Sequence, residues 1–447
     1  MKTALALAVL VACAPSRSAL RAPVDALVAK RLALASGKVP ELLARPIDRA
    51  AAIKIAIANN ARLAATFDEL GIAGGELASA IGLGPLEIEA QARFGDAHDA
   101  YEIDVVQGVM GLVSAPRRRA AAHASLDAAR ASAAAQAVRL AARVDIAFTD
   151  LLAAMRALEM RRTAFEAADA SATLRERMFD AGNTSVLEQA RERADREQAR
   201  IDLARAEATL ELRRTTIDAL LGLSGETTRW TATGTLAALP PVAPALDALE
   251  ATAVEASLDL TADRARRDAA ENRVADLRLR TVLPSVGIGI SVHDDGEGRG
   301  IGPMISLGIP LLDWKSGERA SAHAAIDHAT HTLTATAVEL RANARGARIT
   351  ALAAYQEAVH VERVVLPLRQ QILDETLKHY NAMNLDTFAL LMARRDLVAA
   401  EDQHLDAVRR FWNAMAAVDA LRRGVAVEMS TDAAPAAAPS TAPTSEH

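Results

Sequence analysis

Apolar and polar residues alternate position by position in two neighbouring segments near residue 90, which predicts a β-hairpin. The first segment runs from Leu86 to Phe94 as Leu-Glu-Ile-Glu-Ala-Gln-Ala-Arg-Phe. The second starts at Tyr101 and stays largely apolar as far as Val113, with Gly108 inside it. Strict alternation is typical of a strand with one apolar face. We therefore predict strands over about 86–94 and 101–113, joined by a polar turn.

The same pattern occurs again about 200 residues later. Apolar residues alternate with Gly and Ser over 284–292, and again over 303–309. A Gly-rich segment that begins at His293 separates the two runs and is expected to form an exposed turn. A second hairpin is therefore predicted at this place in the chain.

Long Ala-rich segments follow each hairpin and are expected to be helices, because Ala and Leu are strong helix formers. The first covers about 117–179 and returns over 185–223; the second covers about 315–380 and returns over 386–424. Each long helix outruns its return arm by about 40 Å at a rise of 1.5 Å per residue. A preceding helix, over about 46–81 or 245–280, is long enough to stack end to end on the return arm and fill that gap.

An internal repeat accounts for this order. Arg119, His123 and Asp127 recur as residues 319, 323 and 327, at a constant offset of 200. A fixed offset indicates two copies of one structural unit. We predict a mainly α fold with a small β part, built from two tandem repeats of helix, β-hairpin, long helix and helix.

The predicted boundaries follow from these segments. They are a signal peptide over 1–12, an N-terminal lead over 13–45, repeat 1 over 46–225, a linker over 226–244, repeat 2 over 245–424 and a disordered tail over 425–447.

Composition narrows the functional classes. Of the 447 residues, 51% are apolar but only 3% are aromatic, so Ala, Leu, Val and Ile must form the core. The net charge of −6 argues against a nucleic-acid surface, which would be basic. No Gly-rich phosphate loop, Cys/His metal set or nucleophile–base signature was found, so no enzyme activity and no cofactor are expected.

The N-terminus resembles a secretory signal, with Lys2 before a short apolar run. Leu10-Val-Ala-Cys13 also resembles a lipobox, in which Cys13 would be lipidated and tether the chain to a membrane outside the cytoplasm. The alternative is an ordinary signal that is cleaved elsewhere and carries Cys13, the only cysteine, away.

Strands of about ten residues with one apolar and one polar face match transmembrane barrel strands. Four strands cannot close a barrel, whereas three copies would supply twelve, which is within the known range. The alternative is a soluble four-stranded sheet packed on a helix.

The chain resembles the TolC-type outer-membrane factor family over about Pro46 to Gly424. The resemblance rests on Ala58-Asn-Asn-Ala-Arg-Leu63, Arg177-Met-Phe-Asp-Ala-Gly182, Leu220-Leu-Gly-Leu223, Leu283-Pro284 and Ile309-Pro-Leu-Leu-Asp313. The short chain and the last of these motifs are similar to the heavy-metal-efflux branch (CzcC-like). The family implies a homotrimer with an outer-membrane β-barrel and a periplasmic α-helical tunnel. It also implies docking of a periplasmic adaptor and an inner-membrane pump, of the RND type, at the helical turns.

Three groups of residues are the candidate sites. The resemblance places adaptor docking and a gate at the two helical turns, at Asp180, Gly182, Asn183, Glu188, Asn384 and Asp386. The family's aspartate ring falls on Ala389 and Met392 here, so no such ring is expected. The polar strand residues expected to face the pore are Glu87, Glu89, Arg93, Glu102 and Asp104.

His323, Asp327 and His331 lie one helical turn apart and so share one helix face. This spacing could bind a transition metal. The first repeat has no counterpart to His331, which favours the alternative of a solvated polar face. We interpret the whole chain as a subunit of a passive outer-membrane duct for small molecules or metal ions. The alternative is a periplasmic coiled-coil adaptor or scaffold lipoprotein without a pore.

Overall fold

The structure is a computed structural model that describes residues 16–33, 39–81, 86–94, 100–282, 285–294, 298–308, 316–385 and 387–427. The predicted signal, Cys13, Asp386 and the predicted tail beyond residue 427 lie outside the described residues. Two of the motifs behind the family resemblance, 283–284 and 309–313, lie outside them as well.

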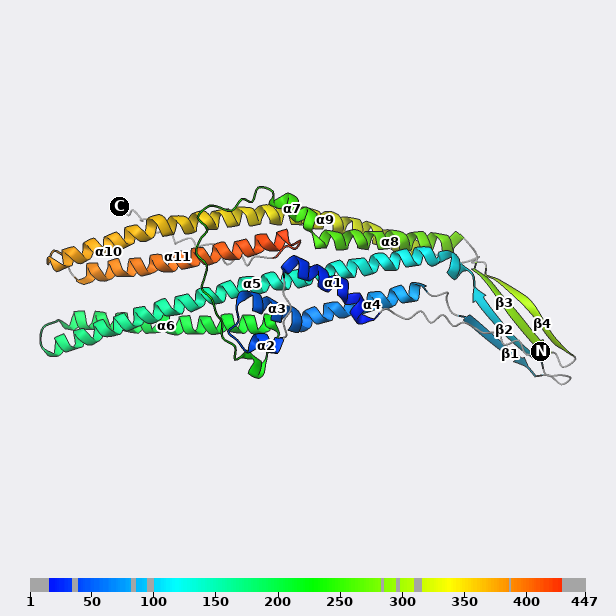
Figure 1. The fold of residues 1–447 in the computed structure, drawn as a ribbon, viewed down its shortest axis with the longest axis horizontal. Helices are drawn as coiled ribbons and strands as arrows, with labels where there is room; N and C mark the ends of the chain where they lie inside the picture. Colours follow the sequence, from blue (N-terminus) through cyan, green and yellow to red (C-terminus); the bar gives the residue numbers. More distant parts are fainter. Residues whose placement is uncertain are drawn as a thin grey trace, which may run out of the picture.

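The chain is strongly elongated, with a sheet at one end and two helical turns at the other (Figure 1). Its first part contains α1 (Arg17–Leu32), α2 (Val39–Leu43), α3 (Arg49–Asn59), α4 (Ala61–Ile81), β1 (Leu86–Arg93), β2 (Ala100–Gly108), α5 (Met110–Asp180) and α6 (Val186–Leu221). A 3-10 turn, η1 (Gly225–Thr228), leads into the connection. The second part contains α7 (Leu249–Ala256), α8 (Leu258–Val282), β3 (Ser285–Asp294), β4 (Arg299–Gly308), α9 (Ser316–His360), the π-helical turn η2 (Val361–Val365), α10 (Leu366–Asn381) and α11 (Thr387–Arg422). The predicted tandem repeat of helix, hairpin, long helix and helix is confirmed.

The long helices form a wall of four columns side by side. Helix α5 packs on α4 and α6 on one side and on α8 and α11 on the other, and α9 packs on α8 and α11 in turn. The order across the wall is therefore α4 with α6, then α5, then α8 with α11, and last α9 with α10. The strands that these helices lead into follow the same order, β1-β2-β3-β4.

End-to-end stacking completes the first and third columns, as the helix lengths predicted. The carbonyls that end α6 accept side-chain hydrogen bonds from the junction before α4: Asn60 donates to Leu220 (2.9 Å), and Asn59, the last residue of α3, donates to Leu221 (3.0 Å). In the third column the Leu258 amide donates to the Gly424 carbonyl at 2.9 Å. These bonds satisfy carbonyls at a helix end that have no partner within their own helix.

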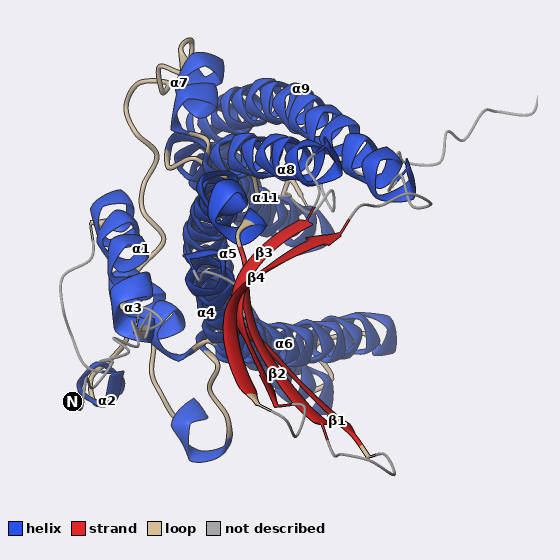
Figure 2. Cartoon of the chain, turned by 90° about the vertical axis from the view of Figure 1, so that its right-hand side faces the viewer, coloured by secondary structure: helices blue, strands red, loops and turns tan. Residues whose placement is uncertain are grey.

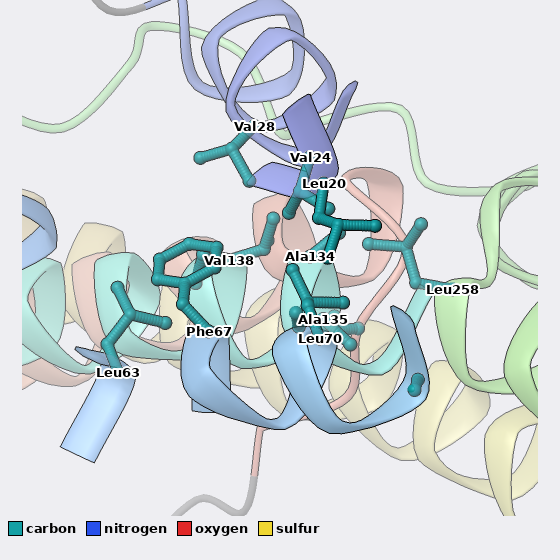
Figure 3. Packing of buried hydrophobic residues seen from close by; sticks show 14 of the residues in the cluster. Leu20, Val24, Val28, Leu63, Phe67, Leu70, Ala134, Ala135, Val138 and Leu258 are labelled. Carbon is teal, nitrogen blue, oxygen red and sulfur yellow. The ribbon is translucent and has the colours of Figure 1, made fainter. Parts of the chain in front are cut away.

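Alanine makes up much of the buried core. Residues 133, 134, 135 and 137 of α5 are all alanines with no exposed surface. Leu63, Phe67 and Leu70 of α4 pack against this part of α5 from one side (Figure 3). Small side chains let the helices approach closely, which explains how a chain with few aromatic residues fills its core.

The second strand is shorter than predicted. The apolar run predicts a strand as far as Val113, but β2 ends at Gly108 and α5 begins at Met110. The last ladder pair joins Gly108 to Gly287, and the Val109 amide still donates to the Val286 carbonyl (2.8 Å) before the helix begins at Met110. A short apolar run fits a strand or a buried helix equally well, and the neighbouring chain decides between them.

The predicted helix from Pro46 to Ile81 is two helices. The side chain of Asp48 accepts a hydrogen bond from the Ala51 amide and caps α3. Ile47, just before it, forms a bridge to Ala232 of the linker. The break between α3 and α4 lies at Asn60, whose side chain caps α4 by accepting a hydrogen bond from the Leu63 amide at 3.1 Å.

The long helix of the second repeat is also interrupted. Residues 361–365 are π-helical, directly before Pro367 in the first turn of α10. Proline has no amide hydrogen and its ring crowds the carbonyl four residues earlier, so the backbone widens there. Helix α5 has Pro116 near its start instead and continues as an α-helix.

Candidate functional site

The four strands form one antiparallel, curved sheet (Figure 2). Its register places Ile88, Val105 and Ile290 in one cross-strand row and Glu89, Asp104 and Ser291 in the next. Paired residues point to the same face, so mainly apolar and mainly polar rows alternate, although Gln107 stands in the apolar row of Leu86 and Ile288. The apolar rows are the ones predicted from the alternation.

The apolar face is open. None of the described helices covers it, and its large side chains are strongly exposed: Ile88 67%, Ile301 76% and Ile305 75%. Further exposed residues of this face are Leu86, Tyr101, Ile103, Ile288, Ile290, Val292 and Leu307. An apolar surface of this size needs a partner that is not water. In the described part of the chain, no helix is both long and apolar enough to cross a bilayer.

The polar face is the crowded face of the curved sheet. A Cβ atom on Gly287 would lie 2.4 Å from Ser306 Oγ, and one on Gly289 would lie 2.2 Å from the Val105 carbonyl oxygen. Asp104, on the same face, is only 6% exposed, although its neighbours on the apolar face are open. Crowding on one face and exposure on the other place the polar residues on the concave side.

The five candidate strand residues lie together on this polar face. The register pairs Glu89 with Asp104 and places Glu102 beside His293, while Arg93 lies opposite Ala100 at the outer end. The sequence analysis does not predict two of their neighbours on this face, Ser291 and His293. His293 was read as the start of a loop, but β3 runs to Asp294 and β4 already begins at Arg299. The Arg-Gly-Ile-Gly sequence that opens β4 does alternate, so a signal for the longer strand was present.

Both edges of the wall are open. Strands β1 and β4 each have one ladder partner among the described residues, as do the helical columns above them. The four strands alternate in direction, so β4 of one copy would run antiparallel to β1 of another. The fold therefore ends in two complementary edges rather than in a closed barrel.

The turn between α5 and α6 contains four of the candidate tip residues. Asp180 ends α5, Gly182 follows in the left-handed conformation with φ +76°, and the Asn183 amide donates to the Met178 carbonyl at 2.8 Å. Glu188 accepts from the Ser185 amide in a capping box. A hydrogen bond from Thr184, and then the one from the Ser185 backbone, lower the pKa of the Glu188 carboxyl below its ordinary value.

The turn between α10 and α11 lies at the same end of the molecule (Figure 1) and has the same backbone hydrogen bonds. The Asn384 amide donates to the His379 carbonyl at 2.9 Å, as Asn183 does in the first turn. The position of Gly182 is taken by Met383, which has a φ of +61° and is 94% exposed. A non-glycine residue in this conformation costs about 1 kcal/mol or more.

The three candidate metal ligands, His323, Asp327 and His331, are all exposed on one helix, α9. The guanidinium of Arg278, a cation, lies 3.5 Å from Nε2 of His323. Within the described residues, no group of three or more His, Cys, Asp or Glu side chains is placed to hold a metal. A single chain therefore offers no built metal site here.

A set of ion pairs that tie the two helical hairpins together was not predicted. Asp150 of α5 accepts from Arg409 (3.0 Å) and Asn413 (2.8 Å) of α11. Nearer the tips, Arg161 pairs with Asp402, and Arg395 pairs with Asp195. The partners are about 200 to 260 positions apart, so no local pattern reveals them.

One acid in this part of the wall, Asp145, has a shifted pKa. Burial raises the pKa of the Asp145 carboxyl above its ordinary value, and the Arg49 guanidinium at 2.8 Å opposes that rise. Arg49 also donates to Thr149 at 3.1 Å, so this contact fixes α3 against α5. These groups join two helices, so we assign them a structural role.

Comparison with known proteins places this architecture. No family model matches the chain. The cobalt-zinc-cadmium resistance protein CzcC of Cupriavidus metallidurans is 24% identical over 385 residues, which cover 85% of this chain and 91% of that protein. The outer-membrane channel OprN superposes with a TM-score of 0.71 at 18% identity, covering 83% of this chain and 89% of OprN. The chain has the fold of the TolC-type outer-membrane channels.

Two further structures of this fold agree. The outer-membrane protein VceC of Vibrio cholerae gives a TM-score of 0.69 at 16% identity, covering 84% of this chain and 95% of VceC. CusC, whose structures concern folding and transmembrane channel formation, gives 0.69 at 14% identity over 88% of this chain and 94% of its own. The resemblance read from the sequence is therefore confirmed, and so is the predicted fold class.

Proposed function

We propose that this chain is one subunit of a passive, trimeric outer-membrane duct in a tripartite efflux system. The observation that carries the proposal is the sheet, which has an exposed apolar outer face, a polar concave face and two unpaired edges. In lipid, every backbone polar group needs a partner, so an open sheet of this kind must close into a barrel. The duct itself catalyses no reaction.

Three copies of the chain supply enough strands to close the barrel. Each chain supplies four strands of eight to ten residues, which suits the hydrocarbon thickness when the strands are tilted. Joining β4 of one copy to β1 of the next continues the antiparallel order, and twelve strands lie within the range of known barrels. The four helical columns per chain then continue the barrel as a periplasmic tunnel.

The cargo is proposed to be cationic. The concave face carries four carboxylates, Glu87, Glu89, Glu102 and Asp104, against one candidate cation, Arg93. Threefold repetition turns them into acidic rings, which favour cations in a pore. The similarity to the cobalt-zinc-cadmium resistance protein supports divalent metal ions as the cargo.

The partners are proposed to dock at the other end. Both helical turns lie there, with Asn183 in one and Asn384 in the other. A periplasmic adaptor would contact these tips and connect the tunnel to an inner-membrane pump of the RND type. Lipidation of Cys13 would add an anchor in the outer membrane.

Extraction and sizing test the duct against the adaptor alternative. The full chain is expected to require detergent and to elute as a trimer, and to conduct cations after reconstitution into liposomes. Replacing Glu87 and Glu89 by Gln should lower the preference for cations over anions without abolishing conductance. A protein that is released in plain buffer once the signal and Cys13 are deleted, and that conducts nothing, would be the poreless adaptor instead.

A further inference from the structure

Helices α5 and α9 have equivalent faces in the two repeats, but the face of α5 is covered by α8 and that of α9 is exposed. On α5, Ser125, Ser132 and Arg139 contact α8 and are half-buried. The matching positions of α9, 200 residues later, are Ala325, Thr332 and Glu339, and all of them are exposed. The α9 face is thus a junction surface without its partner in the single chain.

The junction inside the chain has a regular register. Three side-chain contacts join α5 to α8: Arg139 with Asp259 (2.5 Å), Ser132 with Arg266 (2.6 Å) and Ser125 with Arg273 (3.1 Å). Each step of seven residues back along α5 matches a step of seven forward along α8. The two helices therefore pack as an antiparallel pair in one fixed register.

The partner of α9 can be found by the same repeat. Helix α4 corresponds to α8, because Asn60 and Ser257 cap the two helices in the same way, each accepting from the amide three residues on. The preceding carbonyls match as well: a Cβ on Gly222 would meet the Asn59 carbonyl oxygen, and one on Gly424 would meet that of Ala256. Both comparisons give the same offset, since 257 − 60 and 256 − 59 equal 197.

We propose that α9 of one copy packs on α4 of the next copy in this register, through an ion pair between Glu339 and Arg62. These residues occupy the places of Arg139 and Asp259, with the charges exchanged. The same transfer sets Thr332 opposite Glu69, where the chain itself has Ser132 opposite Arg266. The inference rests on the proposed trimer and adds the residues that set its register.

The exposed face of α4 fits this role. Ala61, Ala65 and Ile72 are exposed and stand where α8 has Leu258, Ala262 and Ala269, which are all at most 4% exposed. Arg62 and Glu339 are both exposed, and the described part of the chain provides neither with an ion-pair partner. A small, partly apolar strip flanked by complementary charge is what a second copy would cover.

The exchanged charges also select the correct neighbour. Packing α9 on α8 of another copy would set Glu339 against Asp259, and packing α5 on a foreign α4 would set Arg139 against Arg62. Like charges at such positions are destabilising, so mispaired assemblies are disfavoured. The seam therefore distinguishes the junction between copies from the junction within a copy.

A designed disulfide tests the register. By the same register, Ala335 of α9 and Ala65 of α4 lie nearly opposite each other, and their counterparts within the chain, Ala135 and Ala262, are both at most 1% exposed. The double variant A65C/A335C, in the full-length protein extracted in detergent, is expected to give covalent trimers on a non-reducing gel. Each single variant should give none, and A65C/A342C, about 10 Å out of register, should cross-link far less.

Charge exchange gives an independent readout. R62E alone or E339R alone should lower the temperature at which the trimer dissociates, and R62E combined with E339R should restore it. The matched control is E76R. Glu76 lies 14 positions after Arg62 on α4, and the register places it opposite the uncharged Ala325, so this charge reversal should change the dissociation temperature little. A detergent-stable trimer that fails to cross-link and shows no rescue would overturn the register while leaving the proposed duct intact. A protein that stays monomeric in detergent would overturn the duct itself.

Discussion

Helix α5 in the middle of the wall and helix α9 at its edge are the same element of two repeats, yet their surroundings differ. Between residues 131 and 138 of α5, seven of the eight side chains are alanine, serine or valine and most are fully buried. Over the matching residues of α9 the chain has His331, Thr332, Thr334 and Thr336. The middle helix is packed on two sides within its own chain, whereas the edge helix is packed on one.

The difference teaches how a duplicated unit becomes part of a ring. The repeat preserves helix length, order and hydrogen-bonded turns, because those follow from local sequence. It relaxes the side chains wherever a neighbour within the chain is replaced by a neighbour from another copy. The residues that differ most between the repeats are therefore a guide to the surfaces between copies.

The largest expected effect breaks the middle of the wall. Leu126 of α5 is 2% exposed, whereas its counterpart on α9, Ile326, is only half-buried. Leu126→Ala should destabilise the fold by about 2–5 kcal/mol, because it leaves a cavity in a packed core. Ile326→Ala should cost less than half as much. Thermal unfolding of both variants in detergent, followed by circular dichroism, measures the contrast, and equal losses would contradict it.

The second-largest loss of stability is expected from a substitution at the junction between stacked helices. Gly222 has a φ of +68° and a Cβ there would lie 2.8 Å from the Asn59 carbonyl oxygen, whereas Gly182 at the tip has a φ of +76° and open space around it. Gly222→Ala should therefore cost at least about 2 kcal/mol, from backbone strain and the clash together. The matched change Gly182→Ala should cost about 1 kcal/mol from strain alone. Urea unfolding of the two variants compares them, and a larger loss for Gly182→Ala would refute the packing argument.

The smallest effect sharpens the comparison of the two tips. Met383 holds the left-handed position that Gly182 fills in the first repeat. Met383→Gly should stabilise the second turn by about 0.5–1 kcal/mol, since it removes the strain at the cost of some chain entropy. Hydrogen exchange of the amides at residues 382–384 should slow in this variant. Faster exchange would mean that the methionine side chain stabilises the turn through a contact that compensates for its backbone.

Much of this architecture was readable from the sequence. The alternation over 86–94 and 101–105 determined which side chains share a face, since a strand has a period of two. The lengths of the helical segments required α4 to stack on α6 and α8 on α11. The offset of 200 required a second copy of the whole unit.

The tertiary structure decided where elements end and what they meet. Residues 110–113 form the first turn of α5 instead of the end of β2, and Arg299 belongs to β4, where it pairs with Asp294. Gly287 and Gly289 show which face is concave only through their distance to neighbouring strands. The ion pairs of Asp150 join helices far apart in sequence. Local periodicity specifies a helix or a strand and its apolar side, but contacts between distant segments depend on the packed arrangement, which no local pattern encodes.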